Sequence, residues 1–147
     1  MEGKRFQIYK CPVCDTVVEV LHQWSLELVC CGPPMIPLRA KTRQEGWEDH
    51  APVIEKVQGG LRLAIGDTPH PMTNAHRIEW IELVAQGRSH RQFLSPGQPP
   101  EAVFSVKSPA ALVRLYCTVH GLWQSTLAGG LKASSQRDAD KAELVCS

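Results

Sequence analysis

VIEKVQGGLRLAI, residues 53–65, is the stretch of sequence that decides the fold. Two short runs rich in apolar and β-branched residues, 53–57 and 61–65, flank Gly59-Gly60, which is typical of a two-residue β-hairpin turn. Similar runs follow at residues 77–85, 90–94, 102–106, 112–117 and 122–127, separated by Gly, Pro and Ser. About seven strands with regularly spaced turns predict an all-β domain, a sandwich of two antiparallel sheets. No strand alternates with a long amphipathic helix, which argues against an α/β fold.

The first part of the chain, about residues 1–37, predicts a small module that is held together by a metal. So short a segment buries too little apolar surface to be stable alone. Cys11 and Cys14 form a CxxC motif, and Cys30 and Cys31 are adjacent. Four thiolates from two segments make a tetrahedral site for iron or zinc, and the spacing does not decide between them. Adjacent cysteines point in divergent directions, so we expect the second pair to distort the tetrahedron.

Composition and charge exclude several classes of function. The 147 residues carry a formal net charge of +1, which gives no electrostatic case for binding nucleic acid or an anionic membrane. The N-terminus lacks the apolar run of a signal peptide, and no stretch approaches the roughly 20 apolar residues of a membrane span. We therefore expect a cytoplasmic protein whose cysteines bind metal rather than form disulfides. Residues 38–50 are interpreted as a linker that enters a second module, 38–127, and residues 128–147 as a disordered tail.

Five side chains in the second module offer a coordination set for one transition metal. Four are imidazoles and one is a thiol: His50, His70, His76, His120 and Cys117. Such donors suit iron, copper or zinc and exclude calcium and magnesium. Five donors also exceed the four that close a structural zinc site. The set therefore predicts a metal with a sixth position open to a small ligand.

The local context favours these residues as ligands. Pro69 and Pro71 restrict the backbone on both sides of His70. Cys117 and His120 form a C-x-x-H chelate between two predicted strands. His50 ends the linker, and His76 lies at the start of the run 77–85. The remaining histidines, His22 and His90, are interpreted as ordinary surface residues.

Several motifs, in this order and spacing, closely resemble those of the two-iron superoxide reductases, the desulfoferrodoxins. They are YKCPVC (9–14), ELVCCGPPM (27–35), HAPVIEK (50–56), TPHPMTNAHRIEWIEL (68–83), FLSPG (93–97) and YCTVHGLW (116–123). The match covers about residues 6–125. The four-cysteine module alone also resembles desulforedoxin, and the second module alone resembles the one-iron neelaredoxins.

The resemblance implies two irons per chain and a specific activity. It implies a rubredoxin-like iron bound by the four cysteines and a catalytic iron with four histidines in a plane and Cys117 on the axis. The second module would be an immunoglobulin-like antiparallel sandwich, and the protein a homodimer. The activity would be one-electron reduction of superoxide to hydrogen peroxide, for detoxification, with electrons from a rubredoxin-like donor.

The residues before His50 both match and depart from the family pattern. Glu48 matches a glutamate that, in the family, occupies the sixth position of the oxidised iron and leaves on reduction. Asp49 replaces the lysine that attracts superoxide and organises water for proton delivery. Lys41 or Arg43 in the linker could supply the missing charge, and the sequence leaves this open.

Three other functions remain as alternatives. The protein could be a non-catalytic iron electron-transfer protein, although an open coordination position argues against this. It could be a sensor of oxygen, superoxide or nitric oxide, although no DNA-binding motif supports that role. It could also be a zinc-stabilised interaction module, which would be colourless.

Overall fold

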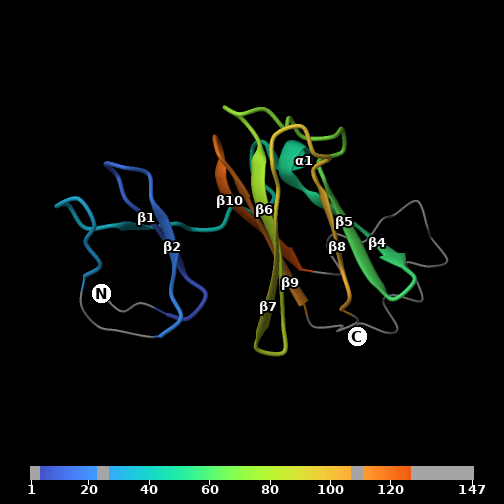
Figure 1. The fold of residues 1–147 in the computed structure, drawn as a ribbon, viewed down its shortest axis with the longest axis horizontal. Coiled ribbons are helices and arrows are strands. Elements are labelled where there is room, and N and C mark those ends of the chain that lie inside the picture. Colours follow the sequence, from blue (N-terminus) through green and yellow to red (C-terminus); the bar gives the residue numbers. More distant parts are fainter. Residues whose placement is uncertain (1–3, 23–26, 107–110, 127–147) are drawn as a thin grey trace. The chain divides into compact units, whose positions relative to one another are not determined.

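The computed structural model describes residues 4–22, 27–106 and 111–126, and the chain divides into two compact units, Met1–Arg39 and Ala40–Ser147 (Figure 1). The tail predicted for residues 128–147 lies outside the described residues. Each unit is built from antiparallel strands, which confirms the all-β prediction. In the part of the chain that the structure describes, no helix is long and apolar enough to cross a membrane.

The first unit is a three-stranded antiparallel sheet in the order β2-β1-β3. Its strands are β1 (Ile8–Lys10), β2 (Val17–Glu19) and β3 (Ile36–Pro37). The core of this sheet is small and consists of Tyr9, Cys11, Val20 and Met35. Because one of these four residues is itself a cysteine of the predicted metal site, the core and the site are a single structure.

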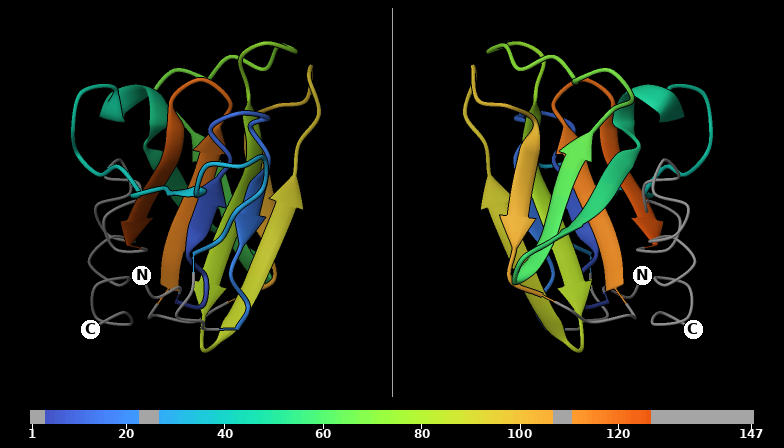
Figure 2. Two further views of the ribbon diagram at one scale, coloured as in Figure 1. Left: turned by 90° about the vertical axis from the view of Figure 1, so that its left-hand side faces the viewer. Right: turned by 90° about the vertical axis from the view of Figure 1, so that its right-hand side faces the viewer.

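The second unit holds two sheets and one helical turn. The first sheet has the order β10-β9-β6-β7 and the second has the order β4-β5-β8. The elements are α1 (Trp47–His50), β4 (Pro52–Val57), β5 (Gly60–Ile65), β6 (Ile78–Ala85), β7 (Arg88–Phe93), β8 (Glu101–Phe104), β9 (Ala111–Cys117) and β10 (Gly121–Thr126). Figures 1 and 2 show the two sheets as separate layers, with α1 at one end of them. The predicted seven-stranded sandwich is therefore confirmed.

Inward-facing side chains of both sheets form the core between the layers. On β5, Leu61, Leu63 and Ile65 are buried and alternate with less buried residues, as expected for a strand with one face against the core. Ile81 and Leu115 oppose each other across β6 and β9 and are fully buried in the same cluster. These contacts fix the register of the strands. In this register the start of β6 lies beside the end of β9.

The first hairpin differs from its prediction by one residue. Val57 pairs with Gly60, so the turn consists of Gln58 and Gly59 rather than Gly59-Gly60. Gly59 has a φ of 83°, which favours glycine. Gly60 lies in β5 for a different reason, since a Cβ there would come within 2.0 Å of the Phe104 carbonyl oxygen. The second glycine therefore permits the close approach of β8.

The linker predicted for residues 38–50 is more ordered than expected. Lys41 pairs with Trp123 in an isolated parallel bridge. The last four residues of the linker form α1. Gly46, at the N-terminus of this turn, has a φ of 89°. His50 therefore lies on a helical turn rather than in a loop.

Candidate metal centres

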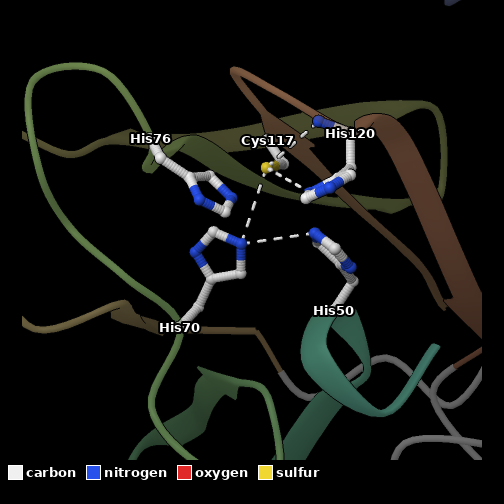
Figure 3. A group of neighbouring side chains, drawn as sticks. All are labelled: His50, His70, His76, Cys117 and His120. Carbon is white, nitrogen blue, oxygen red and sulfur yellow. Dashed lines mark hydrogen bonds between the residues drawn. The ribbon is translucent and has the colours of Figure 1, made fainter. Parts of the chain in front are cut away.

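The five predicted donors meet at one end of the sandwich. His50 ends α1, and His70 and His76 lie on the connection between β5 and β6. Cys117 ends β9, where it pairs with Ile78 and Gly121. His120 lies in the turn between β9 and β10. The donor atoms of these five side chains all lie within 4.8 Å of one another. Figure 3 shows the five side chains pointing toward one another.

The four imidazoles form a closed ring of neighbours. The centroid distances around this ring are 4.9 Å for His50–His70, 4.8 Å for His70–His76, 5.1 Å for His76–His120 and 5.0 Å for His120–His50. The four edges are nearly equal, and each histidine lies beside two others. The thiol of Cys117 points into the same space (Figure 3).

Main-chain carbonyls fix the orientation of two rings. The Nδ1 atom of His50 lies 2.8 Å from the Gly46 carbonyl, and that of His70 lies 2.8 Å from the Pro71 carbonyl. A carbonyl only accepts, so each Nδ1 carries the proton and each Nε2 keeps a free lone pair. The two Nε2 atoms face each other at 3.2 Å. Burial lowers the pKa of His50 and lowers that of His70 to about 4, so both rings are neutral near pH 7.

Cys117 is fully buried, and its sulfur lies beside two of the rings. The Sγ atom is 3.5 Å from Nε2 of His70 and 3.7 Å from Nδ1 of His120. Burial raises the pKa of Cys117, whereas main-chain N–H groups of His120 and Val119 and the charge of Lys41 act in the opposite direction. A metal ion would replace the thiol proton, because coordination requires the thiolate.

The spacing of the five donors fits one transition metal. With a metal–nitrogen distance of about 2.1 Å, neighbouring nitrogens in a square are about 3.0 Å apart and opposite ones about 4.2 Å. The 3.2 Å separation of the His50 and His70 nitrogens and the 4.8 Å limit for the group agree with this geometry. Nε2 of His76 is buried without a hydrogen-bond partner, which a bound cation would supply. His120 is exposed, so the site is open to solvent on one side.

The four cysteines of the first unit form a second group of donors. Cys11 is buried, and the other three, Cys14, Cys30 and Cys31, are exposed. The Sγ atoms of Cys14 and Cys30 are 3.8 Å apart, as are those of Cys30 and Cys31. A tetrahedron with metal–sulfur bonds of about 2.3 Å has edges of about 3.8 Å. The adjacent pair therefore reaches tetrahedral spacing, contrary to the expected distortion.

The pKa values of these thiols also indicate that the four cysteines bind a cation. Hydrogen bonds with Thr16 lower the pKa of Cys14 to about 6, so this thiolate forms readily. Hydrogen bonds with the other cysteines raise the pKa of Cys31 to about 12. Four thiolates therefore coexist at neutral pH only with a metal ion between them, and sulfur donors select zinc or iron.

Trp123 supports the histidine group, and the sequence did not single it out. Its ring stacks on His50 with centroids 4.4 Å apart and an interplanar angle of 4°. Trp47 contacts Trp123 at a centroid distance of 6.2 Å. Lys41 Nζ lies 5.4 Å from the Trp123 ring centre, and the Arg43 guanidinium lies 5.9 Å from that of Trp47. The only sequence signal was the position of this tryptophan three residues after His120.

The other candidate residues lie outside the two groups. Glu48 and Asp49 are exposed on α1, and no carboxylate joins the donor groups found among the described residues. Asp49 acts on His50 by its charge, which raises the pKa of that imidazole against the effect of burial. His22 is exposed and His90 is half-buried on β7, and neither belongs to a donor group.

An antiparallel sandwich with a four-histidine, one-cysteine centre, joined to a four-cysteine sheet, defines a class of two-module metalloproteins. The sequence pattern of the desulfoferrodoxin family matches residues 41–126, and that of the desulfoferrodoxin N-terminal domain matches residues 3–38. The chain belongs to the desulfoferrodoxin family, as its motifs predicted.

Known proteins similar to this chain agree with that assignment. A desulfoferrodoxin from Syntrophotalea carbinolica is 48% identical over 123 residues, which cover 84% of this chain and 98% of the relative. A superoxide reductase from Pyrococcus horikoshii is 34% identical over 111 residues, which cover 60% of this chain and 95% of the relative. The crystal structure of the superoxide reductase from Treponema pallidum shares the fold, with a TM-score of 0.65 at 19% identity, covering 84% of this chain and 98% of that one.

Proposed function

We propose that this protein is a superoxide reductase with two irons per chain. The observation that carries the proposal is the closed ring of four imidazoles beside a buried thiol, open to solvent at His120. The catalytic iron would be held by these five side chains, and the second iron by Cys11, Cys14, Cys30 and Cys31. When bound, the catalytic iron supplies one electron to superoxide.

The residues that would hold the catalytic iron give the centre a charge that suits an anionic substrate. Neutral imidazoles contribute no charge, so with a single thiolate the ferrous centre keeps a net positive charge, which attracts superoxide. Burial of Cys117 keeps its sulfur away from water, and the N–H of His120, 3.4 Å away, stabilises the thiolate. The exposed side admits water as the source of protons. Superoxide thereby gains one electron and two protons and becomes hydrogen peroxide.

The stoichiometry of the reaction tests this function. The iron-loaded, reduced protein is mixed with a limiting amount of superoxide, and peroxide and dioxygen are measured. We expect one peroxide per superoxide and no dioxygen. Half a peroxide with dioxygen would indicate dismutation, and no consumption would indicate an electron-transfer protein. Cys117→Ser is the matched control, because it alters the second unit and leaves the four cysteines of the first unchanged.

Glu48 is proposed as the sixth ligand of the oxidised iron. It lies two residues before His50 on the single turn of α1, and its side chain is exposed and therefore able to move. A hard carboxylate prefers the more highly charged ferric ion. On reduction the carboxylate would leave and open the position to superoxide.

The remaining assignments extend the same proposal. We assign residues 1–37 to the four-cysteine iron module, 38–127 to the catalytic module and 128–147 to a tail. A small rubredoxin-like protein would return the electron in each cycle, in the cytoplasm, where the reaction removes superoxide. Family resemblance supports a homodimer, and light scattering of the iron-loaded protein measures this directly.

A further inference from the structure

Lys41 is held beside the histidine centre by its main chain. It forms an isolated parallel bridge with Trp123. Its N–H donates to the Leu122 carbonyl at 2.8 Å, and its own carbonyl accepts from the N–H of Gln124 at 3.0 Å. These two bonds attach the residue to β10, although 82 positions separate it from Trp123 in the sequence. Its backbone position is therefore fixed.

The side chain of Lys41 places its charge on the indole that supports a ligand ring. The Nζ atom lies 5.4 Å from the Trp123 ring centre, a cation–π contact. Trp123 is 1% exposed, and it stacks on His50 at 4.4 Å. Because the ring that both groups contact is buried, the field of the ammonium group is less screened on this side than in bulk water.

We propose that Lys41 is a positioning residue of the histidine centre, whose charge, held on Trp123, favours the ferrous state of the iron. The inference rests on the proposed function, since it requires iron at the five donors. Reduction adds one electron and so lowers the positive charge of the centre by one unit. A neighbouring cation therefore stabilises the reduced state relative to the oxidised state.

The charges around the centre support this role. The main chain of Lys41 is hydrogen-bonded to Leu122 and Gln124, the two neighbours of Trp123 on β10, so its charge is held on the side of the centre that this indole covers. Asp49 acts on His50 with the opposite sign. Asp49 is exposed on α1 directly before His50, so it places a negative charge beside the centre. Lys41 offsets that charge from the Trp123 side.

A redox titration of the iron-loaded protein tests the proposal. Lys41→Met keeps an unbranched stem on the indole and removes the charge, whereas Lys41→Arg keeps the charge. Lys56→Met removes an exposed lysine on β4 and serves as the matched control. The midpoint potential of the histidine-centre iron is followed through its thiolate-to-iron absorption band.

We expect Lys41→Met to lower the ferrous-to-ferric ratio at a fixed potential by about threefold to tenfold. This corresponds to a fall in the midpoint potential of roughly 30 to 60 mV, since a tenfold change is 59 mV for one electron. Lys41→Arg should restore most of the ratio, and Lys56→Met should leave it unchanged. An unchanged midpoint in Lys41→Met that keeps its iron and absorption band would overturn the inference, even if the encounter rate with superoxide fell. Absence of the band in the unsubstituted protein would instead overturn the proposed function.

Discussion

The indole of Trp123 lies parallel to the imidazole of His50, with an interplanar angle of 4° and centroids 4.4 Å apart. The carbonyl of Gly46 holds the same imidazole through Nδ1 at 2.8 Å. His50 is therefore fixed on one face and at one nitrogen, which leaves Nε2 directed at the other donors. A ligand that is oriented before the metal binds loses less conformational freedom on binding.

Replacement of Trp123 should weaken both the fold and the histidine centre. Trp123→Ala removes a side chain that is 1% exposed, and we expect the free energy of unfolding to fall by about 3–5 kcal/mol. Trp123→Phe keeps a ring beside His50 and should lose less. Denaturant unfolding and iron content per unit measure the two effects.

A second buried tryptophan provides the control for this experiment. Trp80 stacks on Tyr116 rather than on a histidine, with centroids 6.0 Å apart. Trp80→Phe should therefore reduce stability without lowering iron occupancy of the histidine centre. If Trp123→Phe and Trp80→Phe lost this iron equally, stacking on His50 would have no specific role.

The two iron centres should be separable by mutation, since their donors share no residue and lie in different units. Cys14→Ser removes a proposed ligand, whose pKa is lowered to about 6 by hydrogen bonds with Thr16 so that its thiolate forms readily. We expect the absorption of the four-cysteine iron to be disturbed and the superoxide reaction to continue at a similar rate. Absorption spectra and the rate with superoxide test this. Loss of the reaction with the histidine-centre iron still loaded would show that the units are functionally coupled.

The sequence predicted the strands and the donor residues because both leave local signals. Alternating apolar residues in β5 and the C-x-x-H spacing of Cys117 and His120 follow directly from strand and turn geometry. The four residues of α1 were not predicted, since a single turn has no helical period, and its only local signal is Gly46. The Nδ1 acceptors were also missed, because a carbonyl leaves no trace in the sequence.

Contacts between distant residues account for the other differences. Gly60 appeared to belong to the turn, but its lack of a Cβ is required by Phe104 on β8, which the sequence does not place beside it. Glu82, in the middle of the β6 pattern, gave no sign of being 0% exposed. It lies on the opposite face of the strand from Ile81 and Leu83, and its partners come from β7 and β9. Long-range pairing of this kind is set by the tertiary fold.

Glu82 should contribute to stability in a pH-dependent way. Burial opposes the ionisation of its carboxyl. Three groups outweigh this effect and hold the pKa below its usual 4.5: the guanidinium of Arg114 at 2.6 Å, the hydroxyl of Ser89 and the guanidinium of Arg91. The ionised form therefore stabilises the fold above pH 4.5, and this contribution is lost as the pH falls through the lower, folded-state value.

Glu82→Gln should remove this part of the acid dependence. At pH 7 we expect a loss of about 3–5 kcal/mol, because the buried guanidinium of Arg114 and the partly exposed one of Arg91 lose their carboxylate. Below pH 4 the difference between the variant and the unsubstituted protein should shrink. Urea unfolding between pH 3 and pH 7 measures this difference, and a constant difference across the range would contradict the assignment.

Glu48→Ala should change the oxidised protein and leave the reduced protein nearly unaltered. If Glu48 binds only the ferric iron, its removal lets water or hydroxide take the position. The thiolate-to-iron band of the oxidised protein should then shift, and the shift should depend on pH. Glu45→Ala is a suitable control, since Glu45 is also an exposed glutamate close to α1. Identical oxidised spectra for Glu48→Ala and the unsubstituted protein at every pH would refute ligation.

Asp49→Lys should accelerate the encounter with superoxide. Asp49 is exposed beside His50, and the substitution changes the local charge by two units. At about 8 Å with an effective dielectric of roughly 40, each unit contributes about 1 kcal/mol with an anion before screening. Two units correspond to a rate increase of roughly thirtyfold before screening, which salt reduces to roughly tenfold. Lys41 lies on Trp123 and Arg43 lies on Trp47 of α1, so the rate of Asp49→Lys also tests whether these two cations already supply the charge.

The salt dependence of the rate separates steering from other effects of Asp49→Lys. An added positive charge should make the second-order rate fall more steeply with ionic strength, since steering is screened. Asp49→Asn changes the charge by one unit and should give an intermediate rate and slope. Asp67→Asn, at an exposed aspartate after β5, controls for a general change in net charge. An unchanged rate and salt slope in Asp49→Lys with full iron content would mean that another cation already steers superoxide to the centre.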